Sequence, residues 1–323
     1  MSNIRTAIIN GITGQDGAYL AEFLLAKDYQ VVGLARNNNP GSLGNLDYLG
    51  IKEKVEIICV DVSNPLQCLE LLSRVKVNEF YNLAAQSSVS YSFEVPAETV
   101  HYNILSVLHL LETIRKTNPS IKFYQASSSE MYGKIEKLPI KQNDALHPVS
   151  PYGISKATGH WLVNQYREAY GLFAASGVLF NHESFLRPES FFVKKVIRSA
   201  IKIKHGLQAN LTVGNIDIKR DFGYAREYVK AIWLMLQAEK PTDLHVCSGS
   251  SVSLREIVYY VFDHYQLNKN LVVQDKALYR PAEIEDIYGD NSAMKALGWK
   301  YDYTFFEVLD ILMEEEERNF SGE

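Results

Sequence analysis

The sequence has few cysteines, no long apolar run and no large excess of charge of either sign. Three cysteines, Cys59, Cys68 and Cys247, stand among 323 residues, and their spacing fits neither a disulfide framework nor a zinc site. Cys59 and Cys247 lie in apolar, strand-like runs, so we expect both to be packed. We predict no metal.

No stretch approaches the roughly 20 consecutive apolar residues that a membrane-spanning helix needs. The N-terminus lacks the apolar segment of a signal peptide, because its first apolar run leads directly into glycines. A net charge of −5 and a pI of about 6.0 provide no general attraction to nucleic acid or membranes. We therefore expect a cytoplasmic protein that binds neither.

A glycine-rich turn follows the first predicted strand. Residues 6–10 form a short apolar run, Gly11, Gly14 and Gly17 follow it, and residues 18–25 have a helical pattern. A strand, a glycine turn and a helix in this order predict a pyrophosphate at the helix N-terminus. Gly11 would allow the tight turn, Gly14 the approach of phosphate, and Gly17 close packing of the helix on the strand. The spacing is G-x-x-G-x-x-G rather than G-x-G-x-x-G.

Predicted strands alternate with predicted helices after this turn. This order favours an α/β fold with a doubly wound, Rossmann-like parallel sheet, whose ligands gather at the carboxyl ends of the strands. The further strands are expected at residues 30–35, 55–60, 80–85, 121–127 and 173–180, and helices at 96–116 and 152–169.

The pattern becomes shorter and more mixed from about residue 206. We predict a dinucleotide-binding domain over residues 1–180, to which later segments return, and a mainly substrate-binding lobe over residues 181–323. The acidic tail at residues 314–318 is expected to be a solvated helix end.

Residues at the ends of three strands bear on the cofactor. Arg36 ends the second strand, where NAD enzymes usually carry a carboxylate, so it favours the 2′-phosphate of NADP, with NAD possible. Asp61, after the third strand, could accept a hydrogen bond from adenine or cap the helix that begins near Pro65. Small residues such as Ala84 and Ala85 end the fourth strand and suit close approach of a dinucleotide.

Tyr152 and Lys156 lie four residues apart on a predicted helix and therefore share one face. A nearby ammonium favours the phenolate and lowers a pKa that starts near ~10, which predicts an acid/base group. Ser128, at the end of the preceding strand, could hydrogen-bond the same substrate oxygen. A surface Tyr–Lys pair is the alternative interpretation.

Spaced cations in the later half predict an anion site. Lys195, Arg220 and Arg280 could bind a diphosphate, and Glu283 could accept from ribose hydroxyls. Solvated surface charges are the alternative for each of these residues. His182 has no partner at metal-ligand spacing, so a structural or cofactor contact is preferred.

These motifs together resemble the extended short-chain dehydrogenase/reductase family. The resemblance rests on the glycine turn, residues 82–86, the Ser128-x-Glu130 triplet and the Tyr152-x-x-x-Lys156 pair. Residues 11–17, 181–184 and 280–283 are similar to its GDP-mannose 4,6-dehydratase branch, and the similarity extends to about Trp299.

The resemblance implies a redox-neutral dehydration of a GDP-sugar. Tyr152 would remove the C4-hydroxyl proton while hydride leaves C4 for NADP+, and Lys156 and Ser128 would support this step. Glu130 would then remove the C5 proton, the C6 hydroxyl would leave as water, and the hydride would return to C6.

The resemblance also implies two binding sets. We predict contacts to the cofactor from Gly11, Thr13, Gly14, Gln15, Asp16, Gly17, Arg36, Asp61, Val62, Leu83, Ala84, Ala85, Ser87, Tyr152, Lys156, Leu179, His182 and Arg187. We predict contacts to the GDP-sugar from Ser87, Ser88, Glu130, Asn181, Lys195, Arg220, Arg280 and Glu283.

The sequence departs from the branch at positions expected to lie near the sugar and the cofactor. Ser128 stands where the branch usually has Thr, and Asn37 replaces the second of two basic residues. Val149 stands where an Arg is usual, and residues 185–188 replace a Pro-Arg-Arg-Gly run. These changes suggest a shifted substrate such as a GDP-heptose. The change at Asn37 also weakens the NADP assignment and the expected tetramer, so a homodimer or a homotetramer is expected. Two alternatives stay open: an enzyme that performs only the C4 step (a 4-dehydrogenase, a 4-keto reductase or a 4-epimerase), and a binding scaffold without turnover.

Overall fold

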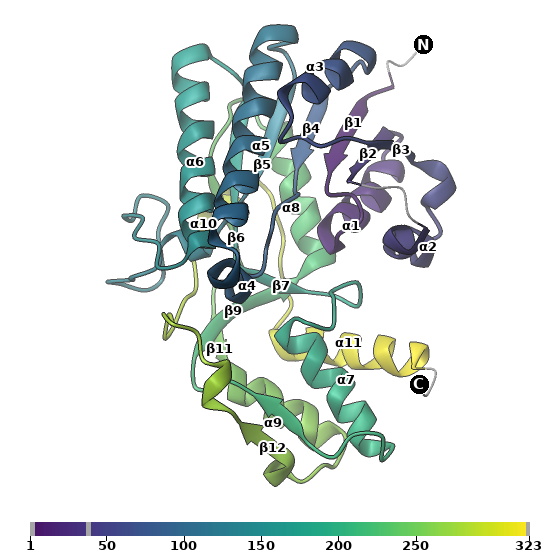
Figure 1. Cartoon of the computed structure of the whole chain (residues 1–323), viewed down its shortest axis with the longest axis vertical. Helices are drawn as coiled ribbons and strands as arrows, with labels where there is room; N and C mark the ends of the chain where they lie inside the picture. The colour runs from purple at the N-terminus through teal and green to yellow at the C-terminus, as the bar shows by residue number, and fades with distance from the viewer. Residues whose placement is uncertain (1–3, 37–39, 321–323) are drawn as a thin grey trace.

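A seven-stranded parallel sheet forms the centre of the computed structural model, which describes residues 4–36 and 40–320 (Figure 1). The strand order is β10-β6-β5-β4-β1-β2-β3. This order confirms the predicted doubly wound α/β fold. The strands are β1 (Thr6–Asn10), β2 (Gln30–Ala35), β3 (Glu56–Cys59), β4 (Glu79–Asn82), β5 (Lys122–Ser128), β6 (Ala174–Leu179) and β10 (Leu244–Val246).

Helices cover both faces of this sheet because successive strand residues point to opposite sides. Ile9 packs with α1 (Gln15–Leu25) and α8 (Ala225–Gln237), whereas Ile8 packs on the other face. The helices on that second face are α3 (Pro65–Arg74), α5 (Pro96–Thr117) and α6 (Pro151–Tyr170).

A smaller lobe lies below the carboxyl end of the sheet (Figure 1). One sheet has the order β11-β9-β7, with β7 and β9 parallel and β11 antiparallel, and a second pairs β8 with β12. The elements are β7 (Asn181–Glu183), α7 (Phe192–Lys204), β8 (Leu211–Val213), β9 (Lys219–Tyr224), β11 (Ser251–Ser253), α9 (Leu254–His264), β12 (Val272–Gln274) and α11 (Phe305–Asn319).

Two later segments belong to the large layer. Strand β10 pairs with β6, and α8 packs against α1. The chain therefore passes from the large sheet to the lobe and back, while the predicted division at residue 180 stays a prediction. Short helices α2 (Gly44–Tyr48), α4 (Val89–Glu94) and α10 (Ser292–Ala296) complete the order.

Two expectations about single residues were wrong, and one of two alternatives for Asp61 is excluded. Cys59 is exposed because β3 is an edge strand, although Cys247 is buried as expected. The side chain that caps α3 is Asn64 rather than Asp61. Glu316, expected in a solvated helix end, is 3% exposed because it lies on the buried side of its helix, where it pairs with Lys194. Among the helices of the described residues, none is both long and apolar enough to span a membrane.

Candidate active site

The glycine turn joins β1 to α1. Two of its positions, Gly11 and Gly17, have no space for a side chain. Gly11 has a φ of +89°, and a Cβ there would lie 2.8 Å from the backbone nitrogen of Ala84. A Cβ at Gly17 would overlap the Gly11 carbonyl oxygen. The roles predicted for these two glycines follow from this close packing of β1, β4 and α1.

The N-terminus of α1 faces a cavity of about 630 Å³. Gly14 is the N-cap residue, and no side chain in the described part of the chain caps it. Free backbone N–H groups and the positive end of the helix dipole favour an anion at this point. The cavity and the uncapped helix therefore fit the diphosphate of a dinucleotide.

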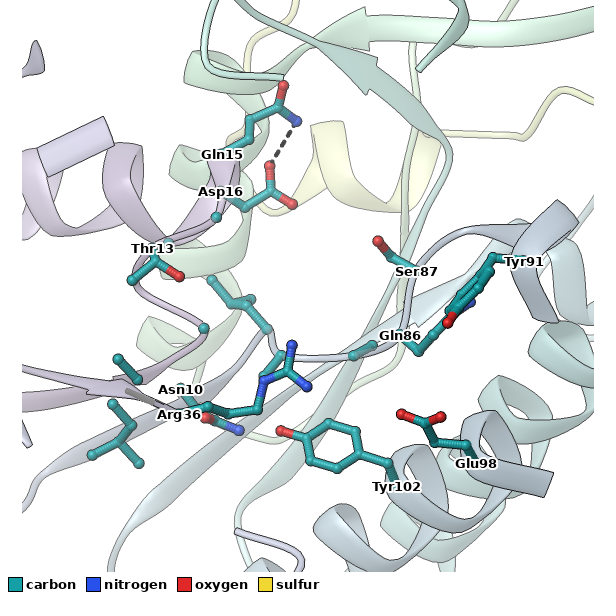
Figure 2. Close-up of a pocket in the computed structure, with 18 of the residues that line it drawn as sticks. Asn10, Thr13, Gln15, Asp16, Arg36, Gln86, Ser87, Tyr91, Glu98 and Tyr102 are labelled. Carbon is teal, nitrogen blue, oxygen red and sulfur yellow. Dashed lines mark hydrogen bonds between the residues drawn. The ribbon is translucent and has the colours of Figure 1, made fainter. Parts of the chain in front are cut away.

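The cavity brings together most of the predicted cofactor residues. Figure 2 shows Thr13, Gln15 and Asp16 on one side of it and Arg36 near Tyr102 on the other. The guanidinium carbon of Arg36 lies 5.9 Å from the centre of the Tyr102 ring. Predicted residues that line the cavity are Gly11, Thr13, Gly14, Gln15, Asp16, Gly17, Arg36, Leu83, Ala84, Ala85, Ser87 and Arg187.

Six predicted cofactor residues do not line this cavity in the described structure: Asp61, Val62, Tyr152, Lys156, Leu179 and His182. The Asp61 carboxylate accepts hydrogen bonds from the backbone and hydroxyl of Ser63, at 2.9 and 2.6 Å. Val62 is buried in the apolar core beneath α3, and Leu179 ends β6. Their contacts to a cofactor stay predictions. Asn37, one of the departures from the branch, lies outside the described residues.

No motif in the sequence marks several further residues that line the cavity. Asn10 ends β1, whereas Glu98, His101 and Tyr102 come from α5. A helical pattern predicts which side of α5 is buried, but not which end of the helix borders a ligand. The additional lining residues are Asn10, Leu34, Ala35, Gln86, Tyr91, Glu98, His101 and Tyr102.

Asp16 and His182 form a buried ion pair beside the helix N-terminus. His182 Nε2 lies 2.9 Å from each carboxylate oxygen of Asp16, and its Nδ1 lies 2.7 Å from the Phe180 carbonyl. Both ring nitrogens face acceptors, an arrangement that favours the protonated ring, in which both nitrogens donate. Burial opposes that charge, but the Asp16 carboxylate outweighs burial and raises the pKa of His182. The ring also stacks on Tyr228, with 4.7 Å between centroids.

The four predicted catalytic residues come from one strand end and one helix. Ser128 ends β5, Glu130 lies in the 3₁₀ turn Ser129–Met131 that follows, and Tyr152 and Lys156 occupy α6. The Ser150 hydroxyl caps α6 by accepting from the Gly153 N–H at 3.0 Å.

The structure places three of these groups in contact or close to one another. The Ser128 hydroxyl lies near enough to the Tyr152 phenol to lower the pKa of that phenol, and the Glu130 charge acts on the same phenol. Lys156 Nζ lies 5.7 Å from the centre of the Tyr152 ring and donates to the Ala126 carbonyl at 2.8 Å.

The expected lowering of the Tyr152 pKa by Lys156 is wrong for this structure. Burial, with a smaller contribution from Glu130, raises the pKa of Tyr152 to about 12, although the Ser128 hydroxyl lowers it. Burial also lowers the pKa of Lys156 to about 8. A tyrosine and a lysine can share one face of a helix, and desolvation can still have a larger effect on the pKa of each side chain than their mutual interaction has.

Opposite the catalytic groups, the lobe presents a cluster of charged side chains. Arg220 is 4% exposed, donates to the Ile284 carbonyl at 2.6 Å, and lies near enough to Glu130 and Arg280 for their charges to act on it. Arg280 Nε lies 3.9 Å from Glu283 Oε1.

Two buried atoms of this cluster have no hydrogen-bond partner within the described residues: Arg220 Nη2 and Glu283 Oε2. Buried polar atoms are rarely left unpaired in native proteins. A ligand with an anionic group and hydroxyls would satisfy both, so these atoms fit a nucleotide sugar.

The other predicted substrate residues lie on neighbouring segments. Lys195 Nζ donates to the Thr212 carbonyl of β8 at 2.7 Å, and Asn181 pairs with Phe222 between β7 and β9. Ser87 lines the cofactor cavity, and Ser88 caps α4 by accepting from the Tyr91 N–H at 3.2 Å. Their contacts to a substrate stay predictions.

Comparison with known proteins identifies the relatives of this chain. A family model described as GDP-mannose 4,6 dehydratase matches residues 8–312. GDP-mannose 4,6 dehydratase 1 of Arabidopsis thaliana is 41% identical over 324 residues, covering 97% of this chain and 90% of the relative. The Homo sapiens GDP-mannose 4,6 dehydratase is 38% identical, and the match covers 94% of this chain and 89% of the relative.

Solved structures share the fold over nearly the whole chain. The structure of RMD from Pseudomonas aeruginosa complexed with NADPH has a TM-score of 0.80 at 26% identity and covers 98% of this chain and 99% of that one. A UDP-glucose 4-epimerase from Thermotoga maritima with UDP-glucose has a TM-score of 0.86 at 19% identity, covering 97% and 99%, a likeness that concerns the fold alone.

Proposed function

The chain belongs to the GDP-mannose 4,6-dehydratase family, and from that premise we propose that it converts GDP-mannose, or a GDP-linked manno-heptose, into the 4-keto-6-deoxy sugar. It is a lyase of the nucleotide-sugar dehydratase class that uses NAD or NADP. The observation that carries the proposal is that Glu130 lies near enough to both the Tyr152 phenol and the Arg220 guanidinium for its charge to act on each.

Each catalytic side chain then has a defined task. In its ionised form Tyr152 takes the proton of the C4 hydroxyl, and Ser128 and the nearby Lys156 ammonium stabilise that phenolate. Glu130 takes the C5 proton, which is acidic once C4 is a ketone. The C6 hydroxyl leaves as water with the proton that Glu130 took from C5, and C5 regains a proton from Tyr152 when hydride reaches C6. One water is therefore lost and the net oxidation state does not change. When bound, the nicotinamide cofactor supplies the acceptor that stores the C4 hydride and returns it to C6.

We assign the cofactor as NADP, held by the N-terminus of α1 and by Arg36. The Arg36 side chain borders the cavity, and a guanidinium suits a 2′-phosphate. The NADPH in the Pseudomonas aeruginosa RMD structure supports the same choice. The dinucleotide that copurifies with the protein tests this assignment, and bound NAD would reverse it.

The finer substrate proposal is a GDP-heptose. It rests on the departures from the branch, among which Ser128, Val149 and residues 185–188 lie in the described structure. Val149 is packed beside the Tyr132 and Ile140 cluster, where an arginine would add a charge. We further propose a homodimer or a homotetramer in the cytoplasm, which light scattering and cell fractionation test.

Mass spectrometry of reaction mixtures tests the function directly. The purified protein is incubated with NADP and either GDP-mannose or GDP-manno-heptose. We expect the loss of one water per sugar without net formation of NADPH, and faster turnover of the heptose. Loss of two hydrogens with accumulation of NADPH would instead identify a C4 dehydrogenase. Tight cofactor binding without any product would identify a scaffold.

A further inference from the structure

Three buried carboxamides form a row across the large sheet. Asn10 of β1 is the register partner of Asn82 of β4, which in turn is the partner of Gln125 of β5. Their side chains are 4%, 0% and 3% exposed. Two residues earlier on the same strands, Ile8, Phe80 and Phe123 form an apolar row on the same face.

The amides are hydrogen-bonded head to tail in one direction. Asn10 Nδ2 donates to Asn82 Oδ1 at 2.7 Å, and Asn82 Nδ2 donates to Gln125 Oε1 at 2.8 Å. Gln125 Nε2 donates to the Ala126 carbonyl at 3.0 Å. Chains of buried hydrogen bonds polarise one another, so the last donor is a strong one.

The row ends on the oxygen that holds the catalytic lysine. Lys156 Nζ donates to the same Ala126 carbonyl at 2.8 Å. That carbonyl therefore accepts from both sides, and the Gln125 amide restricts where the ammonium can lie. At its other end the row reaches Asn10, which borders the cofactor cavity (Figure 2).

We propose that Asn82 and Gln125 are positioning residues for the proposed dehydration: they fix the Ala126 carbonyl, and through it the Lys156 ammonium, beside Tyr152. The inference rests on the proposed function for its catalytic consequence only. If the row served stability alone, its amides would need only to hydrogen-bond one another. A purely structural role does not explain why the row ends on the Ala126 carbonyl, which also accepts from Lys156.

The decisive variant is Gln125→Met, which keeps the length of the side chain and removes the amide. We expect kcat to fall about 10-fold to 100-fold, since a small misplacement of a catalytic group has effects of that order, while KM stays within about twofold. Without the second donor, the Ala126 oxygen serves Lys156 alone and holds its protonated form better. The titration of Lys156, followed by NMR of labelled lysine in the cofactor-free protein and assigned with Lys156→Met, should therefore move to higher pH.

Ser176→Ala is the matched control. Ser176 is the register partner of Gln125 on β6, equally buried, and its hydroxyl has no hydrogen-bond partner in the part of the chain that the structure describes. This variant should keep the kcat and the Lys156 titration of the parent. Gln125→Glu is the second test, because a protonated carboxyl still donates to Ala126. Its kcat should approach that of the parent at low pH and fall as the carboxyl ionises.

A structural role alone would lower only the melting temperature of Gln125→Met. The inference is overturned if Lys156 titrates at the parent pH in Gln125→Met and Gln125→Glu has the pH profile of the parent. If Gln125→Met does not fold, the profile of Gln125→Glu decides. Failure of the parent to turn over any GDP-sugar would refute the proposed function, while the NMR titration still tests the positioning of Lys156.

Discussion

Glu130 and Tyr152 divide the chemistry between two carbons of the sugar. A base at C5 is needed in addition to the one at C4, because the two protons leave from different atoms at different stages. Glu130 lies near Ser128 and Tyr152. Its carboxylate has no hydrogen-bond partner among the described residues. Its loss should therefore separate the two stages.

Glu130→Gln removes the base and keeps the size of the side chain. We expect dehydration to fall by about 100-fold or more, while C4 oxidation survives as bound reduced cofactor, detected by absorbance. Glu136→Gln, at an exposed position of the following loop, should behave as the parent does. Water loss at the parent rate in Glu130→Gln would remove Glu130 from the mechanism.

The titration of Lys156 should produce a pH dependence of kcat. Burial lowers its pKa to about 8, so the ammonium is present below that pH and is lost above it. We expect kcat to decline as pH rises through about 8, in a profile measured between about pH 6 and pH 10. Lys156→Arg keeps its charge throughout, so its residual activity should lack this decline. A parent profile that is flat across this range would contradict the role.

At the level of elements, the β1 turn and α1 are locked by backbone contact. Gly17→Ala places a methyl group against the Gly11 carbonyl, which overpacks the turn. We expect a loss of about 1–3 kcal/mol in the free energy of unfolding and loss of cofactor binding, measured by denaturation and by fluorescence titration.

Gly44→Ala is the control for that substitution. In the described structure no atom lies within 4 Å of a Cβ built at Gly44, and its position in α2 favours alanine over glycine. Stability should be unchanged or slightly higher. Equal stability of the two variants would show that the turn tolerates a side chain at residue 17.

The elements were predictable where a local pattern determines them. The strand at residues 6–10, the glycine turn and the helix at residues 152–169 all follow from residues close in sequence, and the structure has them within one or two residues. The exposure of Cys59 was not predictable, because it depends on β3 being an edge strand. Tyr102 and Glu98 join the cavity only because α5 is brought beside β4, and no short segment contains that information.

The pKa of Tyr152 illustrates the same division for the site. The spacing of Tyr152 and Lys156 correctly indicates a shared helix, but it carries no information about how deeply each is buried. Desolvation is a property of the assembled fold, and here it dominates the effect of the lysine.

For the whole molecule, a buried ion pair joins two helices of the lobe. Lys194 of α7 pairs with Glu316 of α11, and their side chains are 9% and 3% exposed. Lys194→Met leaves the Glu316 carboxylate buried without this partner, so we expect a loss of about 3–5 kcal/mol in urea unfolding. Lys204→Met, which breaks an exposed pair with Glu317 at 3.9 Å, should cost less than about 1 kcal/mol. Equal midpoints for both variants would contradict the structural role of the buried pair.

The return of β10 to the large sheet affects how the protein is made. Synthesis proceeds from the N-terminus, so the strands up to β6 leave the ribosome while residues 244–246 are still untranslated. Until then β6 is an open edge, the kind of surface that templates aggregation, and the apolar face later covered by α8 is bare. A nascent chain of this protein should therefore depend on chaperone protection until its last third has been translated.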